Sequence, residues 1–167
     1  METKIITELT RDNLQLVAHA LRHGDVVAIP TETVYGLGAN GLDVEAMDKI
    51  YAAKGRPSDN PLILHVPNAE SIKPLVKEIP ETAKALIEAF WPGPLTITLP
   101  KSDLVPDRAT GGLNRVALRC PDHAVCRNIL ELAGVPIAAP SANISGRPSP
   151  TTAQSVYDDM NGRIPYI

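Results

Sequence analysis

The amino-acid sequence predicts an α/β domain with a mixed parallel and antiparallel sheet. Short apolar runs typical of strands alternate with segments of helical periodicity along all 167 residues, which is the pattern of an α/β fold. Two predicted strands, 95–100 and 115–121, follow each other with no clear helical segment between them. Strands joined without a crossover helix pair antiparallel, so we expect a mixed sheet and not a purely parallel one.

The individual elements follow from apolar spacing and from the residues that end each run. Helices are predicted where apolar residues recur at every third or fourth position, and strands where short apolar runs stop at proline or glycine. The predicted helices lie within 14–21, 44–54, 83–90, 123–133 and 153–160, and the predicted strands are 25–30, 61–66, 95–100, 115–121 and 136–140. Asp43 and Asp122 are expected to cap the second and fourth helices, and Gly55 to end the second.

The helix at 83–90 illustrates the packing that this spacing predicts. Ala83, Leu86, Ile87 and Phe90 fall on one helical face, and we expect that face to be buried. The segment WPGP at 91–94 then ends the helix, because proline cannot continue it.

Length and composition restrict the class of protein. The chain suits a single domain over residues 1–167. Its net charge of −3 and its aromatic content of 4% argue against a general nucleic-acid surface. No apolar run reaches the ~18 residues of a membrane span, and no signal-peptide pattern opens the chain. Cys120 and Cys126 give neither zinc spacing nor a disulfide framework and are expected in the core, so we predict a cytoplasmic location.

The segment PTETVYGLGANG at 30–41 contains the pattern G-x-G-x-x-G. A dinucleotide fingerprint needs its first glycine directly after a strand and an acidic residue about twenty positions further on. Here five residues separate Pro30 from Gly36, and the next predicted strand ends near His65. We therefore interpret the segment as a loop with a tight backbone path, whose chemistry lies in Thr31 and Thr33, with Glu32 between them.

Four polar loops, 30–38, 53–66, 115–123 and 139–150, lie at the ends of predicted elements. Loops of this kind converge at one edge of an α/β sheet. Together they contain the cations Lys54, Arg56, Arg115, Arg119 and Arg147, the hydroxyl residues Thr31, Thr33, Ser141, Ser145 and Ser149, and Asn60, Asn143 and His65. Guanidinium and ammonium groups with short donors suit a polyanion. With no catalytic triad or paired carboxylates, the set indicates phosphoryl chemistry by positioning and charge neutralisation.

The chain resembles the YrdC-like threonylcarbamoyl-AMP synthase family. The resemblance rests on P-T-E-T-x-Y-G-L at 30–37, K-G-R at 54–56 and S-A-N at 141–143, with FWPGPLT between them. It implies a twisted mixed sheet with a deep basic cavity. It also implies an enzyme that condenses L-threonine, bicarbonate and ATP, with Mg²⁺, to threonylcarbamoyl-AMP and pyrophosphate. A downstream transfer complex would then modify tRNA, and a transient tRNA contact is expected as well.

The resemblance also implies roles for single residues. Thr33, His65, Arg119 and Ala139 fall where the family contacts threonine. Arg56, Asn60, Arg115, Ser141, Asn143 and Ser149 fall at nucleotide contacts, although position 115 is often a small hydroxyl residue in the family. Lys54 and Arg56 are the expected catalytic cations, and no protein metal ligands are assigned. Glu32, the only acid in the first loop, could orient a hydrated Mg²⁺.

Other interpretations remain open at this point. The basic cavity could instead hold tRNA or double-stranded RNA, which a steep salt dependence of binding would reveal. A carbamoyltransferase of hydrogenase maturation shares the domain but carries additional zinc-finger and acylphosphatase modules. The chain stops at GRIPYI within a predicted strand, so we expect a domain that is truncated at its C-terminal end.

Overall fold

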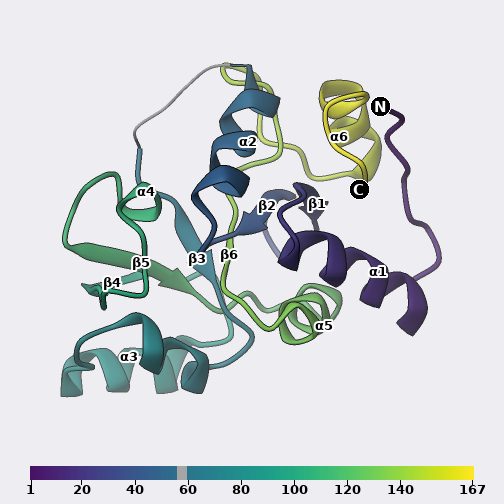
Figure 1. Ribbon diagram of the computed structural model, residues 1–167. Coiled ribbons are helices and arrows are strands. Elements are labelled where there is room, and N and C mark those ends of the chain that lie inside the picture. The colour runs from purple at the N-terminus through teal and green to yellow at the C-terminus, as the bar shows by residue number, and fades with distance from the viewer. Residues whose placement is uncertain (56–59) are drawn as a thin grey trace.

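Six strands form one sheet in the order β1-β2-β6-β3-β5-β4 (Figure 1). The computed structural model describes residues 1–55 and 60–167. The strands are β1 (Val27–Ile29), β2 (Gly36–Asn40), β3 (Ile63–His65), β4 (Ile97–Pro100), β5 (Arg115–Arg119) and β6 (Ile137–Ala138). Strands β3 and β5 are parallel and all other neighbours are antiparallel. The predicted mixed α/β sheet is confirmed, whereas the deep basic cavity stays a prediction.

The helices follow the predicted order, with two short additions. They are α1 (Arg11–Arg22), α2 (Val44–Lys54), the 3₁₀ helix η1 (Ala69–Leu75), α3 (Glu81–Phe90), α4 (Asp107–Thr110), α5 (Ala124–Ala133) and α6 (Ala153–Met160). Asp43 caps α2 and Gly55 ends it with a φ of 83°, as predicted. The prediction for α5 was wrong, because His123 and not Asp122 accepts the capping hydrogen bond, from the amide of Cys126. No helix among the described residues has both the length and the apolar character needed to cross a membrane.

Strand β2 lies where the sequence predicted a loop. Gly38 within the strand and Gly41 directly after it allow the neighbouring strands to approach closely. A Cβ on Gly38 would lie 3.0 Å from Cγ2 of Ile137, and one on Gly41 would lie 2.7 Å from Cδ2 of Leu64. All five residues of the strand are buried. The G-x-G-x-x-G pattern therefore serves strand packing and not a phosphate-binding turn.

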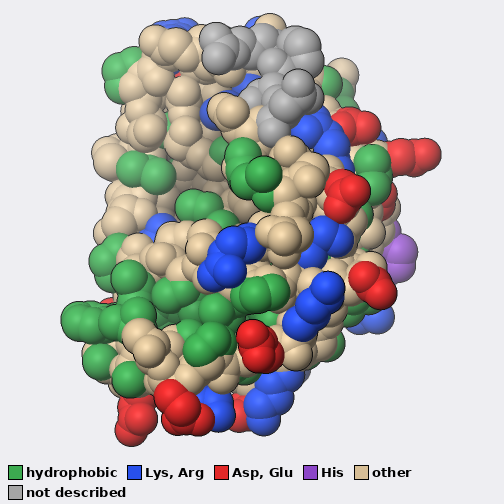
Figure 2. Space-filling view, turned by 90° about the vertical axis from the view of Figure 1, so that its left-hand side faces the viewer, with side chains coloured by type: hydrophobic (Ala, Val, Ile, Leu, Met, Phe, Trp, Pro, Cys, Tyr) green, Lys and Arg blue, Asp and Glu red, His purple; other side chains and the backbone are tan. Residues whose placement is uncertain are grey.

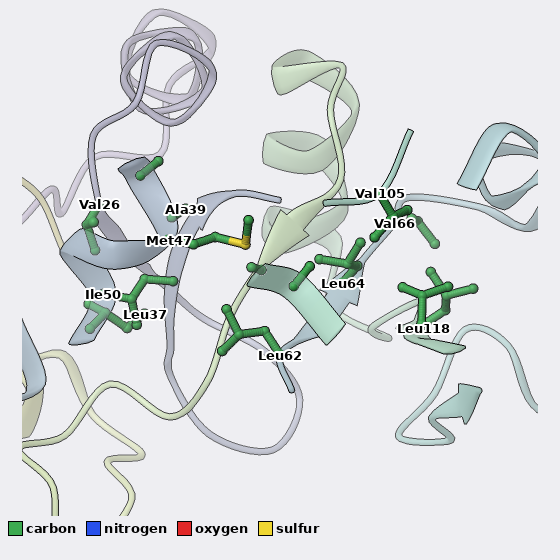
Figure 3. Close-up of a cluster of buried hydrophobic side chains, with 14 of the residues drawn as sticks. Val26, Leu37, Ala39, Met47, Ile50, Leu62, Leu64, Val66, Val105 and Leu118 are labelled. Carbon is green, nitrogen blue, oxygen red and sulfur yellow. The ribbon is translucent and has the colours of Figure 1, made fainter. Parts of the chain in front are cut away.

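Two hydrophobic clusters lie on opposite faces of the sheet. The larger cluster joins α2, α3, α6 and η1 to one face, and Figure 3 shows its centre, with Met47 and Ile50 of α2 close to Leu37 and Leu64. The smaller cluster lies between the other face and the helices α1 and α5. Figure 1 shows these two helices together beside β1, β2 and β6, away from β4 and β5. One face of the sheet is thus covered along only half of its width.

The apolar face of α3 is only partly buried, which differs from the packing expected from the sequence. Ala83 and Ile87 are buried, but Leu86 is 38% exposed and Phe90 is 56% exposed. Figure 2 shows hydrophobic side chains gathered on the lower part of the face where α3 lies. Four residues on one helical face were expected in the core, and only half of them reach it.

The two ends of the chain pair with each other beside β1. The amide of Lys4 donates to Pro165 O at 2.9 Å, and the amide of Ile167 donates back to Lys4 O at 3.0 Å. Tyr166 also forms a bridge to Val27 of β1. The apolar segment at 164–167 is therefore part of the packed structure.

Candidate functional site

The uncovered half of the sheet face carries the predicted site residues. The register places His65 beside Arg119 and Ile63 beside Ala117. Side chains of alternate residues point to the same face of a sheet, so these four share a face, and Thr98 of β4 extends it opposite Ala117. Ala117 and Ile63 are half-buried and Thr98 is exposed, because α1 and α5 do not reach them. The result is an open surface with a wall of polar loops.

Arg119 is held at the C-terminal end of β5 by two loops, which carry Gly93 and the adjacent residues Glu32 and Thr33. Its Nε donates to Gly93 O at 3.3 Å, and its Nη1 and Nη2 lie 3.4 Å from the Thr33 hydroxyl. Its Nη2 also forms an ion pair with Glu32, and only 11% of the Arg119 side chain is exposed. The amide of Gly93 donates to Cys120 O at 2.8 Å, which fixes the loop after α3 against the end of β5. The guanidinium is therefore positioned before any ligand arrives.

His65 lies directly beside Arg119 and is 3% exposed. Burial, and next the charge of Arg119, lower the pKa of His65 to about 4, so the imidazole is neutral at neutral pH. Its Nδ1 lies 3.1 Å from Ile63 O and 3.3 Å from Ile137 O. Both partners are acceptors, so Nδ1 carries the proton and Nε2 is left with a free lone pair. His65 can accept a hydrogen bond from a ligand but cannot supply positive charge.

A second cluster forms around Lys54 at the C-terminal end of α2. The ammonium group donates to Ser141 O at 2.5 Å and to Asn143 O at 2.9 Å. Burial lowers the pKa of Lys54, while the charge of Asp159 acts in the opposite direction. Asp159 itself accepts from the amide of Ile144 and pairs with Arg147 at 2.9 Å. Lys54 thus fastens the 141–147 loop to α2 in the ligand-free protein.

The two clusters lie at opposite ends of the strands, the Arg119 cluster at the C-terminal end of β5 and the Lys54 cluster beyond the C-terminal end of β6. Ser141 forms a bridge to Gly36, and Ala139, which donates to Ile63 O at 3.2 Å, lies between the clusters. The separation can be judged from β5, in which the four-residue step from Arg115 to Arg119 spans about 13 Å. The residues expected to contact threonine gather at one end, whereas Ser141, Asn143 and Lys54 gather at the other.

The remaining predicted residues are less closely engaged. Arg115 is exposed and donates to Thr98 O at 2.8 Å. Asn60 is exposed, and its carbonyl oxygen accepts from the Tyr51 hydroxyl at 3.1 Å. Ser149 lies exposed on the loop before α6. Arg56 lies outside the described residues, so its predicted catalytic role is a prediction still.

Three residues that shape the site were not assigned to it from the sequence. Glu32 was assigned only a possible metal role, yet one of its oxygens pairs with Arg119 and the other accepts from the amide of Asp122 at 2.5 Å. Asp159 carried no signal, because an acid on a helix is common, and Gly93 was recognised only within the FWPGPLT motif and the helix end, with no site role. Cys120 and Cys126 are buried in the core, as predicted, and burial raises the pKa of the Cys126 thiol to about 12.

Comparisons with known proteins give the family. The model of the Sua5, YciO and YrdC proteins, whose description reads "Telomere recombination", matches residues 19–167. The chain belongs to the Sua5/YciO/YrdC family. Two relatives of this Sua5/YciO/YrdC domain are named threonylcarbamoyl-AMP synthase. The protein from Pyrococcus abyssi is 55% identical over 92% of this chain and 45% of its own length, and the one from Bacillus subtilis is 51% identical over 96% and 47%.

A solved structure supports the same family. The crystal structure of P. abyssi Sua5 complexed with L-threonine matches 99% of this chain with a TM-score of 0.94 and 52% identity, and covers 49% of that chain. This Sua5/YciO/YrdC domain therefore spans about half the length of the relatives compared here.

Proposed function

We propose that this domain is an L-threonylcarbamoyladenylate synthase, a nucleotidyltransferase. It condenses L-threonine, bicarbonate and ATP to threonylcarbamoyl-AMP, with release of pyrophosphate and water. The observation that carries the proposal is the placement of two clusters at opposite ends of the central strands. Arg119 lies with Thr33 and His65 on the open sheet face, and Lys54 of α2 fastens the 141–147 loop beyond β6. The names of the close relatives and the threonine complex of P. abyssi Sua5 support it.

The threonine end has the chemistry that an amino acid needs. The guanidinium of Arg119 matches a carboxylate. The Thr33 hydroxyl lies 3.4 Å from that guanidinium, and the lone pair on Nε2 of His65 can accept from an amine or a hydroxyl. Ala139 offers backbone groups next to Ile63 in the middle of the face. A small zwitterion with a hydroxyl group fits this set better than a simple anion does.

The nucleotide end supplies donors and a fixed loop. We infer that Ser141, Asn143, Asn60, Ser149 and Arg115 contact the nucleotide. Lys54 uses its ammonium group on two loop carbonyls, so in the ligand-free state it positions the 141–147 loop. Arg56, the second proposed catalytic cation, would add a guanidinium contact to the phosphates.

The reaction then needs positioning more than acid–base chemistry. The threonine amine takes up bicarbonate and loses water to give a carbamate. A carbamate oxygen attacks the α-phosphorus of ATP, the bond to the β-phosphate oxygen breaks, and pyrophosphate leaves. Arg119 holds the threonine carboxylate, and the open face between the clusters brings the carbamate towards the phosphorus.

Mg²⁺ is proposed to enter with ATP. Among the described residues no group of three or more His, Cys, Asp or Glu side chains is placed to hold a metal ion, and both Glu32 oxygens are engaged. Mg²⁺ favours phosphate oxygens and water over an all-protein cage, so this donor set fits a metal carried by the substrate. When bound, the ion would neutralise charge on the phosphates.

The product suggests the partners. A mixed anhydride of a carbamate and a phosphate is reactive, so we propose that a downstream complex takes the threonylcarbamoyl group from it and transfers it to an adenosine of tRNA. A transient contact with tRNA is part of the same proposal.

The first experiment measures pyrophosphate release from ATP and Mg²⁺, with and without threonine and bicarbonate. We expect release that requires both, and an adenylate of the matching mass. Arg119→Ala is the matched variant, since it removes the carboxylate partner and leaves the Lys54 cluster intact. Release that is independent of threonine, or no release of pyrophosphate at all, would contradict the proposal.

A further inference from the structure

The carboxylate of Glu32 is bound at both oxygens. One oxygen pairs with Nη2 of Arg119, and the other accepts from the backbone amide of Asp122 at 2.5 Å. The Glu32 side chain is 21% exposed, so the pair is largely shielded from water. The loop that carries Glu32 is itself closed by Thr31, whose hydroxyl donates to Val34 O at 2.6 Å and accepts from the amide of Thr33 at 3.2 Å.

This arrangement bears on how Arg119 meets a ligand. A Glu32 that only filled the place of a substrate carboxylate would have to move away on binding. The backbone amide of Asp122 cannot follow such a movement, because Asp122 directly precedes His123, which caps α5 through the amide of Cys126 at 3.2 Å. Release of Glu32 would therefore break the charge-assisted hydrogen bond to this amide, which only solvent could replace at the exposed residue Asp122. The geometry favours a carboxylate that stays in place.

The donors of Arg119 point to the same conclusion. A guanidinium has five N–H groups. Gly93 O, the Thr33 hydroxyl and Glu32 account for Nε and for part of Nη1 and Nη2. Glu32 and Gly93 bind the guanidinium from two different loops, so its orientation is fixed. One N–H group of Nη1 is left for a ligand.

We propose that Glu32 is a positioning residue, which holds the Arg119 guanidinium in the orientation that receives the carboxylate of the amino-acid substrate. This inference rests on the proposed function. It adds Glu32 to the residues on which threonine binding depends. Glu32 acts through Arg119 and contributes to threonine binding, not to the nucleotide.

The test is the Glu32→Gln variant, with Glu88→Gln on the exposed face of α3 as the matched loss of one carboxylate. Loss of a charge-assisted hydrogen bond should raise the Kd for threonine by about tenfold or more. Calorimetric titration measures the Kd for threonine and for ATP separately. We expect the Kd for ATP and the melting temperature to stay close to the wild-type values, and the KM for threonine to rise while kcat at saturating threonine is retained.

The outcomes separate the alternatives. A selective loss of threonine affinity in Glu32→Gln but not in Glu88→Gln supports the positioning role. Unchanged or tighter threonine binding overturns it, and tighter binding would mean that Glu32 competes with the substrate for Arg119. If Glu32→Gln does not fold, Glu32→Asp is judged by the same criterion, since it keeps the charge but cannot reach both partners. A wild-type chain that binds threonine but releases no pyrophosphate refutes only the proposed function, whereas one that binds no threonine refutes both.

Discussion

Lys54 is 9% exposed as a residue, and its ammonium group donates to the carbonyl oxygens of Ser141 and Asn143. A lysine in such a place stabilises the fold because it gives the carbonyl groups a donor. A buried carbonyl without a donor costs free energy. The charge is therefore part of the structure of the loop as well as a potential partner for phosphates.

Lys54→Met should lower the free energy of unfolding by roughly 1–3 kcal/mol, because the carbonyl groups of Ser141 and Asn143 lose their donor. Urea denaturation measures the change. Lys77→Met, at an exposed position, is the control and should have little effect. Equal stability of the two variants would show that the loop does not depend on Lys54.

His65 should make stability depend on pH. Its pKa falls from 6.5 to about 4 on folding, so between these values the unfolded chain binds a proton that the folded chain does not. The contribution of His65 to the free energy of unfolding is fully present above pH 6.5. It is lost as the pH falls towards 4, and the total loss is roughly 3 kcal/mol.

Urea denaturation at pH 7 and pH 4.5 tests this dependence on His65. His65→Gln should lose less stability than the wild type between the two pH values. His19→Gln, on the exposed side of α1, should behave like the wild type. If His65→Gln loses as much stability as the wild type between pH 7 and pH 4.5, other groups cause the acid sensitivity.

At this scale the sequence predicted which residues would gather but not what each would do. Strand register brings His65 beside Arg119, and Thr33 reaches Arg119 from the loop before β2. Their contact with threonine stays a prediction. The partners of Lys54 and Glu32 depend on loops 141–147 and 120–123, which are distant in sequence. No local pattern contains that information.

Among the elements, the segment after α3 connects helix packing to the site. A Cβ on Gly93 would lie 2.5 Å from the carbonyl oxygen of Phe90, and Gly93 O accepts from Arg119. The sequence identified WPGP as the end of a helix and as part of the FWPGPLT motif of the family, without a role for Gly93. Its second function, as a backbone support for the guanidinium, follows from the position of β5 beside it.

Gly93→Ala should lower the free energy of unfolding by about 1–3 kcal/mol through this overlap, and should also weaken threonine binding. Urea denaturation and calorimetric titration measure the two effects. Pro94→Ala in the same segment is the control and should leave threonine affinity near that of the wild type. A destabilised Gly93→Ala that binds threonine normally would show that the support is not needed.

Strand β2 shows why one element was missed. Strands are recognised by branched and aromatic side chains, whereas Gly36, Gly38 and Gly41 have none. Their value lies in the 3.0 Å and closer approaches of Ala139, Ile137 and Leu64, which exist only in the folded protein. The helices were easier to predict, because their apolar spacing is local.

For the molecule as a whole, ligand binding should raise thermal stability. Threonine at a hundred times its Kd would add about 2.7 kcal/mol, or about 5–10 °C in melting temperature for a domain of this size. Thermal denaturation with L-threonine measures the shift. L-threoninamide, which lacks the carboxylate that Arg119 would bind, should give little or none, and an equal shift would contradict the role of Arg119.

The pairing of residues 4–6 with 165–167 beside β1 has a consequence for synthesis. The first of these segments leaves the ribosome long before the second has been translated, and β1 also lacks its neighbour Tyr166 until then. The amino-terminal segment therefore cannot find its native partner before residues 165–167 have been synthesised. The rest of the sheet can assemble around the larger cluster first, and the two ends close the structure only at the end of translation of this domain.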